Sequence, residues 1–138
     1  MQFAPLEELL RTSDIVTLHI PLMDSTRNFI SKRELDFMKP TAVLINAARG
    51  GLVNERDLLE ALDQGRLLGA GLDCLVNEKD KLNVNDPMLH NDKIALMPHI
   101  GGTSNDIAEA MVPRMAANVV RFVKGEPLLS VANREYLL

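Results

Sequence analysis

Side chains that could form one chemical site stand at separated points of the sequence: Arg49, Asp73, Glu78 and His99. The planar guanidinium of Arg49 suits a carboxylate held by two parallel hydrogen bonds. The other side chains can gain or lose a proton, and Glu78 follows Asp73 by five residues. Each also has a structural alternative: a solvated loop arginine, a turn-capping aspartate, a solvated glutamate and a structural histidine.

The elements around Arg49 give it a defined place. The apolar run 41–46 behind Pro40 predicts a buried strand. Gly50 and Gly51 then permit a tight turn and a close approach of a ligand to the backbone. Asn54 is typical of the cap of a helix. An arginine at a strand's carboxyl end, before a turn into a helix, stands where open α/β sheets bind ligands.

Strand and helix patterns alternate along the rest of the chain. Apolar runs predict strands over 15–20, 41–46, 68–72 and 94–97, and helical patterns predict helices over 5–11, 31–38 and 55–64. Thr103 or Ser104 begins a predicted long helix that ends near Lys124, and Pro113 should kink or split it. This alternation favours an α/β fold with a parallel sheet, whose strand ends would bring the polar side chains to one cleft.

Composition narrows the class of protein. The chain has 138 residues, 46% hydrophobic residues and a net charge of −4. With no basic patch and no apolar run long enough for a bilayer, we predict no nucleic-acid partner and no membrane segment. The single cysteine fits a reducing compartment, the amino end lacks a signal-peptide pattern, and we predict a cytoplasmic protein. No metal site is predicted.

Four segments together resemble one family. They read LHIPL, INAARGGLVNE, GAGLDCLVNE and MPHIGG, and their order and spacing resemble the NAD-dependent D-2-hydroxyacid dehydrogenases. That family includes D-lactate and phosphoglycerate dehydrogenases and glyoxylate/hydroxypyruvate reductases. The resemblance implies a Rossmann-type doubly wound parallel sheet, of which this chain holds half, with about four strands, crossover helices and a long C-terminal helix.

The resemblance also implies roles for the polar side chains. Arg49 would bind the carboxylate of a small 2-keto or 2-hydroxy acid and polarise its carbonyl. His99 would donate the proton to the carbonyl oxygen, and Glu78 would fix the histidine tautomer. The hydride would come from NAD, with NADP an open alternative. The implied cofactor-binding residues are Ile20, Pro21, Ala47, Ala48, Arg49, Asp73, His99, Gly101 and Gly102.

The chain lacks a Gly-x-Gly-x-x-Gly turn between a strand and a helix, since its one Gly-x-Gly, Gly69-Ala70-Gly71, lies inside a predicted strand. We therefore expect residues 1–138 to form one partial domain, the second half of a dinucleotide-binding domain with its C-terminal helix and tail. We also expect the chain alone to be inactive.

The predicted half-domain also bears on the oligomeric state and on an alternative, non-catalytic function. Strand 15–20 would be an unprotected sheet edge, which favours a homo-oligomer. Certain transcriptional corepressors share these motifs. A non-catalytic interaction module, or an inert half-domain derived from this family, is therefore the alternative to a fragment of an oxidoreductase.

Overall fold

A computed structural model describes residues 2–78 and 83–131 of the chain. It divides the chain into two compact units, residues 1–101 and 102–138. The first unit contains the sheet and the side chains of the predicted catalytic set, and the second contains a long helix. The single partial domain expected over residues 1–138 stays a prediction.

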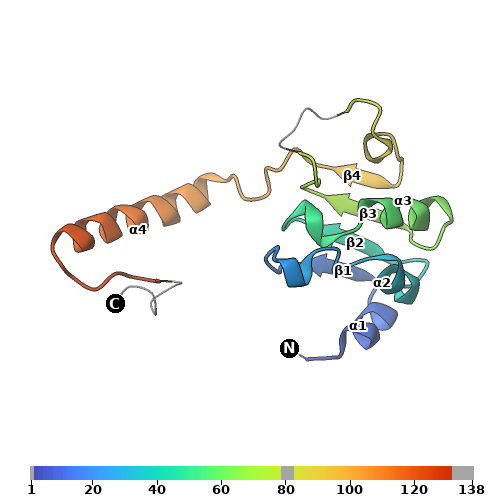
Figure 1. Ribbon diagram of the computed structural model, residues 1–138, viewed down its shortest axis with the longest axis horizontal. Helices are drawn as coiled ribbons and strands as arrows, with labels where there is room; N and C mark the ends of the chain where they lie inside the picture. The colour runs from blue at the N-terminus through green and yellow to red at the C-terminus, as the bar shows by residue number, and fades with distance from the viewer. Residues whose placement is uncertain (1, 79–82, 132–138) are drawn as a thin grey trace. The chain divides into compact units, whose positions relative to one another are not determined.

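Strands and helices alternate through the first unit (Figure 1). Its strands are β1 (Ile15–Leu18), β2 (Val43–Asn46), β3 (Gly69–Leu72) and β4 (Ile94–Leu96). Its α-helices are α1 (Leu6–Thr12), α2 (Lys32–Phe37) and α3 (Glu55–Asp63), with short 3-10 turns at Asp24–Thr26, Gly50–Leu52 and Pro87–Leu89. Across the described residues the strands pair in parallel in the order β1-β2-β3-β4. The predicted α/β fold is confirmed.

The helix ends follow the signals in the sequence. The side chain of Asn54 accepts a hydrogen bond from the Asp57 N–H (3.1 Å) and so caps α3. Beyond the end of α3, Gly65 has a φ of 67°, the left-handed conformation that a glycine adopts without a Cβ clash. At the start of α2, the Glu34 carboxylate accepts hydrogen bonds from the N–H and O–H of Ser31.

The core lies between the sheet and one layer of helices. Alternate strand residues point toward this layer and are nearly or fully buried, with Val16, Leu44 and Leu72 on three neighbouring strands. Helix residues from α1, α2 and α3 complete the same apolar cluster: Leu10, Leu35, Leu58 and Leu62. The other strand residues face the opposite side and are partly exposed, as the burial pattern of each strand shows.

The second unit is built on α4 (Asn105–Val123), whose N-cap is Ser104. The sequence predicts that Pro113 kinks or splits this helix. A split is wrong, because the helix is continuous through that position, and a kink stays a prediction. Proline removes one helical N–H, and the turns on either side keep their own hydrogen bonds. The following segment folds back on α4, where the Asn118 side chain bonds the backbone N–H and C=O of Leu129 (2.8 and 2.9 Å).

None of the helices in the described part of the chain is both long and apolar enough to cross a membrane.

Candidate active site

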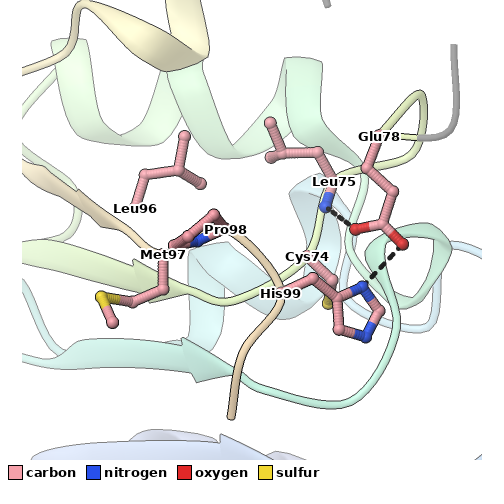
Figure 2. A pocket seen from close by; sticks show the side chains of 7 residues that line it. All are labelled: Cys74, Leu75, Glu78, Leu96, Met97, Pro98 and His99. Carbon is pink, nitrogen blue, oxygen red and sulfur yellow. Dashed lines mark hydrogen bonds and ion pairs between the residues drawn. The ribbon is translucent and has the colours of Figure 1, made fainter. Parts of the chain in front are cut away.

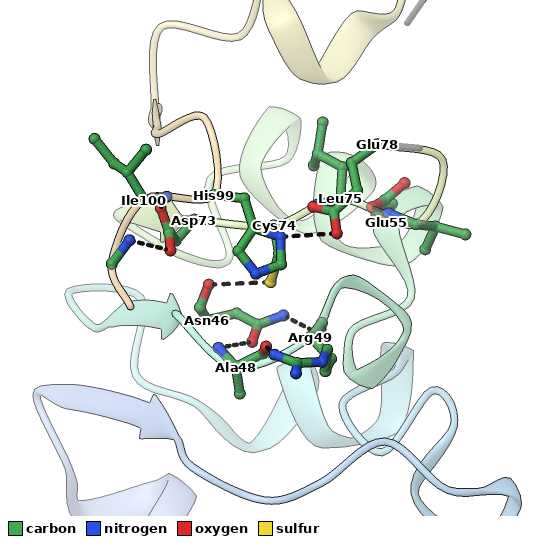
Figure 3. A network of polar contacts seen from close by, with 12 residues as sticks. Asn46, Ala48, Arg49, Glu55, Asp73, Cys74, Leu75, Glu78, His99 and Ile100 are labelled. Atoms are coloured by element: carbon green, nitrogen blue, oxygen red, sulfur yellow. Dashed lines mark hydrogen bonds and ion pairs between the residues drawn. The ribbon is translucent and has the colours of Figure 1, made fainter. Parts of the chain in front are cut away.

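The loops that follow β2, β3 and β4 meet at the carboxyl edge of the sheet (Figure 3). Arg49 stands on the first loop, Asp73 and Glu78 on the second, and His99 on the third. This arrangement follows from parallel pairing, which places the carboxyl ends of all strands at one edge. The structure brings Glu78 and His99 into direct contact, and it places Arg49 on the adjacent turn.

Asn46 shapes the turn that carries Arg49. It is the last residue of β2 and is almost fully buried. Its side-chain N–H₂ donates to the Arg49 carbonyl (2.8 Å), and its side-chain oxygen accepts from the Ala48 N–H (3.1 Å). Both ends of this buried amide are therefore satisfied, and the chain is held in a tight reversal.

Arg49 itself is exposed at this turn. One guanidinium nitrogen donates to the Ala48 carbonyl (2.7 Å). Among the residues that the structure describes, no carboxylate forms an ion pair with Arg49. Its remaining donors can therefore meet an anionic ligand without breaking an internal ion pair.

The Glu78 and His99 side chains form the closest polar pair of the site. The Nδ1 atom of His99 lies 2.8 Å from Oε1 of Glu78, and the two side chains are 41% and 24% exposed. The other oxygen, Oε2, accepts from the Leu75 N–H (3.2 Å). An ionised carboxylate only accepts, so in this contact Nδ1 of His99 carries the proton, and Nε2 is the ring nitrogen that does not contact Glu78.

The backbone at His99 is in the left-handed region, with a φ of 54°. This conformation costs about 1–3 kcal/mol for a residue other than glycine. The Asp73 carboxylate offsets that cost by accepting from the Ile100 N–H (2.9 Å) and the Gly101 N–H (2.8 Å). A Cβ on Gly101 would lie 2.7 Å from Oδ2 of Asp73, so a larger residue would displace the carboxylate from this position. Asp73 thus fixes the chain just after His99.

A cavity of about 660 Å³ opens beside the Glu78–His99 pair (Figure 2). Its lining residues are Cys74, Leu75, Glu78, Leu96, Met97, Pro98 and His99. Burial raises the pKa of the Cys74 thiol to about 11, and the charges of Glu78 and Asp73 act in the same direction. The thiol therefore stays protonated near neutral pH and is a poor nucleophile.

A second cavity, of about 460 Å³, lies on the partly exposed face of the sheet. Small residues from three strands or strand ends leave this space open: Ala47, Gly71 and Ala95. Of the predicted cofactor-binding residues, Ala47, Asp73 and Gly101 line it, whereas Ile20, Pro21 and Ala48 do not. Gly102 belongs to the second unit. These binding roles, like the catalytic roles of Arg49, Glu78 and His99, stay predictions.

Sequence reasoning singled out Gly50 for its turn but gave no supporting role to Asn46 or Glu55. Asn46 holds the Arg49 turn, Gly50 packs against the peptide that joins Leu75 and Val76, and Glu55 bonds the loop that carries Glu78. An asparagine directly before a turn is a recognisable signal for such a side chain–backbone bond. The contact between Glu55 and Val76 joins positions 21 residues apart, and no local sequence pattern predicts it.

Within residues 2–78 and 83–131, no three His, Cys, Asp or Glu side chains are grouped so that they could hold a metal ion.

Residues 1–101 match a family model described as "D-isomer specific 2-hydroxyacid dehydrogenase, NAD binding domain". The glyoxylate reductase of Pyrococcus furiosus is 38% identical over 136 residues, which are 99% of this chain and 40% of that protein. The chain therefore spans about 40% of the length of the curated relatives it matches.

Solved structures resemble the chain over a similar extent. The NAD-complexed D-isomer specific 2-hydroxyacid dehydrogenase of Lactobacillus delbrueckii ssp. bulgaricus matches with a TM-score of 0.86 and 30% identity, over 94% of this chain and 43% of that one. The D-lactate dehydrogenase of Lactobacillus jensenii, solved with NAD+, matches with a TM-score of 0.84 and 31% identity, over 95% and 43% of the two chains.

Proposed function

Because this chain belongs to the D-isomer specific 2-hydroxyacid dehydrogenases, as part of their NAD-binding domain, we propose that it carries the acid–base and carboxylate-binding groups of such an enzyme. The reaction would interconvert a small 2-keto acid and its D-2-hydroxy acid. The relatives named glyoxylate reductase and D-lactate dehydrogenase make glyoxylate and pyruvate the first substrates to test.

The main support for this proposal is the 2.8 Å contact between Nδ1 of His99 and Oε1 of Glu78, two residues that line the first cavity. A carboxylate on Nδ1 stabilises the imidazolium and leaves Nε2–H as the donor toward the cavity.

Arg49, His99 and Glu78 would each have a separate role in the reaction. Arg49 binds the substrate carboxylate, so the carbonyl is held in a fixed orientation near His99. Nε2–H of His99 donates its proton to the carbonyl oxygen as the C=O bond becomes C–O–H, and the reverse reaction returns that proton. Glu78 keeps the ring in one orientation throughout, through Nδ1.

A nicotinamide dinucleotide, when bound, supplies the hydride that reaches the carbonyl carbon. The second cavity fits the flat end of such a cofactor, because its floor of small residues leaves the strands accessible. Ala47 and Gly101 would lie against it, at the carboxyl edge where open α/β sheets bind nucleotides. The description of the matching family names NAD, so NAD is the first cofactor to test and NADP is the alternative.

We expect the 138-residue chain alone to show no turnover of glyoxylate or pyruvate with NADH. Backbone contacts to the pyrophosphate supply much of the binding of a dinucleotide, and this chain has no Gly-x-Gly-x-x-Gly turn to make them. NADH oxidation above that of an Arg49→Ala control would contradict this expectation.

The direct test of the function is a chimera. The aligned 136 residues of the Pyrococcus furiosus glyoxylate reductase are replaced by those of this chain, and NADH-dependent reduction of glyoxylate and pyruvate is measured. We expect turnover. A chimera that folds and binds NADH but reduces neither acid would overturn the proposal in favour of a non-catalytic interaction module.

A further inference from the structure

The carboxylate of Glu55 reaches out of α3 to the loop that carries Glu78. Glu55 is the first residue of α3, and its Oε1 accepts a hydrogen bond from the Val76 N–H at 2.7 Å. Figure 3 shows Glu55 beside Leu75 and Glu78.

The same peptide is confined from a second side by Gly50. A Cβ on Gly50 would lie 2.2 Å from the carbonyl carbon of Leu75 and 2.5 Å from the Val76 nitrogen. The backbone of Gly50 is therefore packed directly against the peptide that joins Leu75 and Val76. With the Glu55 bond to its N–H, that peptide has little freedom to rotate or shift.

The preceding peptide, which joins Cys74 and Leu75, contacts the Glu78 carboxylate. The Leu75 N–H donates to Oε2 of Glu78 (3.2 Å), and Oε1 of Glu78 contacts Nδ1 of His99 (2.8 Å). A continuous path of hydrogen bonds and one turn thus leads from α3 to the imidazole. From this path we infer that Glu55 is a positioning residue for the Glu78–His99 pair, an inference that rests on the function proposed above.

The charges near Glu55 decide which property of its side chain matters. Burial raises the pKa of Glu55, the Val76 N–H lowers it, and the acidic groups that face it, Asp86 and Glu78, raise it. A neutral carboxylic acid still accepts through its carbonyl oxygen. Positioning therefore needs an acceptor atom at this place and no charge, so glutamine should replace glutamate and alanine should not.

Asp57 provides a matched control in the same turn of α3. Its carboxylate also accepts one backbone N–H from another segment, that of Lys32 at 2.9 Å. This contact ties α3 to α2 and leads away from the candidate site. Asp57→Ala should cost stability as Glu55→Ala does, without reaching His99.

The test measures the tautomer of the His99 ring by long-range ¹H–¹⁵N NMR in the full 138-residue chain. The chain has three histidines, and a His99→Gln variant assigns the signal. In the wild-type chain we expect Nδ1–H to dominate. In Glu55→Ala we expect the ratio of Nδ1–H to Nε2–H to fall about tenfold, the effect of one lost hydrogen bond. Glu55→Gln and Asp57→Ala should keep the wild-type ratio.

An unchanged ratio in Glu55→Ala, or an equal fall in Asp57→Ala or Glu55→Gln, would overturn the positioning role. If Glu55→Ala does not fold, Glu55→Met keeps the length of the side chain and removes the oxygen acceptor, and the same outcomes apply. The NMR measurement does not depend on enzymatic turnover. An inactive chimera with the expected ratios would therefore contradict the proposed function and leave the role of Glu55 intact.

Discussion

The helix-covered face of the sheet and its carboxyl edge are held together by different forces. On the covered face, Leu44, Leu58 and Leu62 are fully buried, and apolar contacts bind the layers. At the carboxyl edge, side chains of Asn46, Asp73 and Glu55 bond to backbone groups of neighbouring loops. Apolar burial is non-directional, whereas each of these hydrogen bonds fixes one atom relative to another.

Within one small unit, the covered face contributes mainly to folding stability, and the carboxyl edge fixes the positions of individual atoms. A core of aliphatic side chains tolerates small shifts, because its free energy depends mainly on the area removed from water. The edge loops carry the proposed acid–base pair and would need fixed atom positions, because a displacement of about 1 Å can greatly lower the rate of a reaction. Substitutions in the two regions should therefore change different measured quantities.

The largest effect should come from the exposed groups at the edge. In the chimera, we expect Arg49→Ala and His99→Ala each to lower kcat/KM for glyoxylate by several orders of magnitude, because each removes an interaction with the reacting atoms. Steady-state kinetics measure this effect, and urea denaturation should show unchanged stability. A rate near that of the unsubstituted chimera for either variant would remove its assigned role.

Leu58→Ala should show the opposite behaviour. Leu58 is fully buried on the helix-covered face, and its truncation should lower the free energy of unfolding by about 2–5 kcal/mol. Denaturant titration of the 138-residue chain gives the value. A loss below about 1 kcal/mol would mean that the core around α3 collapses to fill the space, and the contrast between the two regions would weaken.

A third region, the outer strand β1, should decide assembly. We propose that the chain self-associates as a twofold dimer, joined through this edge or by helix exchange, because an edge strand presents unpaired N–H and C=O groups. Light scattering at micromolar concentration should give a dimer mass. Thr17→Lys, which places a charge on the exposed side of β1, should return it to the monomer mass. A monomeric wild-type chain would contradict edge pairing.

The smallest effect should be the pH dependence that Glu55 contributes. Its pKa in the folded chain is raised above the ordinary value of 4.5, chiefly by burial. The stabilising contribution is thus complete below that pH and is lost as pH rises through the higher folded value. We expect the stability of the wild-type chain relative to Glu55→Gln to fall in denaturant titrations as pH rises above the ordinary value of 4.5. A constant difference would contradict the raised pKa.

Much of the fold could be predicted because its signals are local. Asn54 and Gly65 marked the ends of α3, and alternating apolar runs marked the strands. The predicted strand 15–20 was too long, since β1 pairs with β2 only through Leu18. Beyond Asn46 the partner strand turns away into the Arg49 loop, so Ile20 has no strand beside it to pair with.

The candidate site was less predictable, for a physical reason. Parallel strands imply that Arg49, Asp73 and His99 approach one edge, but the pattern cannot say which atoms touch. The left-handed backbone of His99 depends on the Asp73 carboxylate, 27 and 28 residues away from the N–H groups that it accepts. Such contacts depend on tertiary packing, to which the local sequence gives no direct signal.

The order of the strands in the sheet is also the order in which a ribosome makes them. Each new strand can pair with the strand synthesised just before it, so every step closes only the loop of its own crossover. Over residues 15–96 the sheet can therefore grow strand by strand, from β1 to β4, while the chain is still emerging. His99 follows β4, the last of these four strands, so the covered core around β1, β2 and β3 can form before the imidazole that we propose as the proton donor is in place.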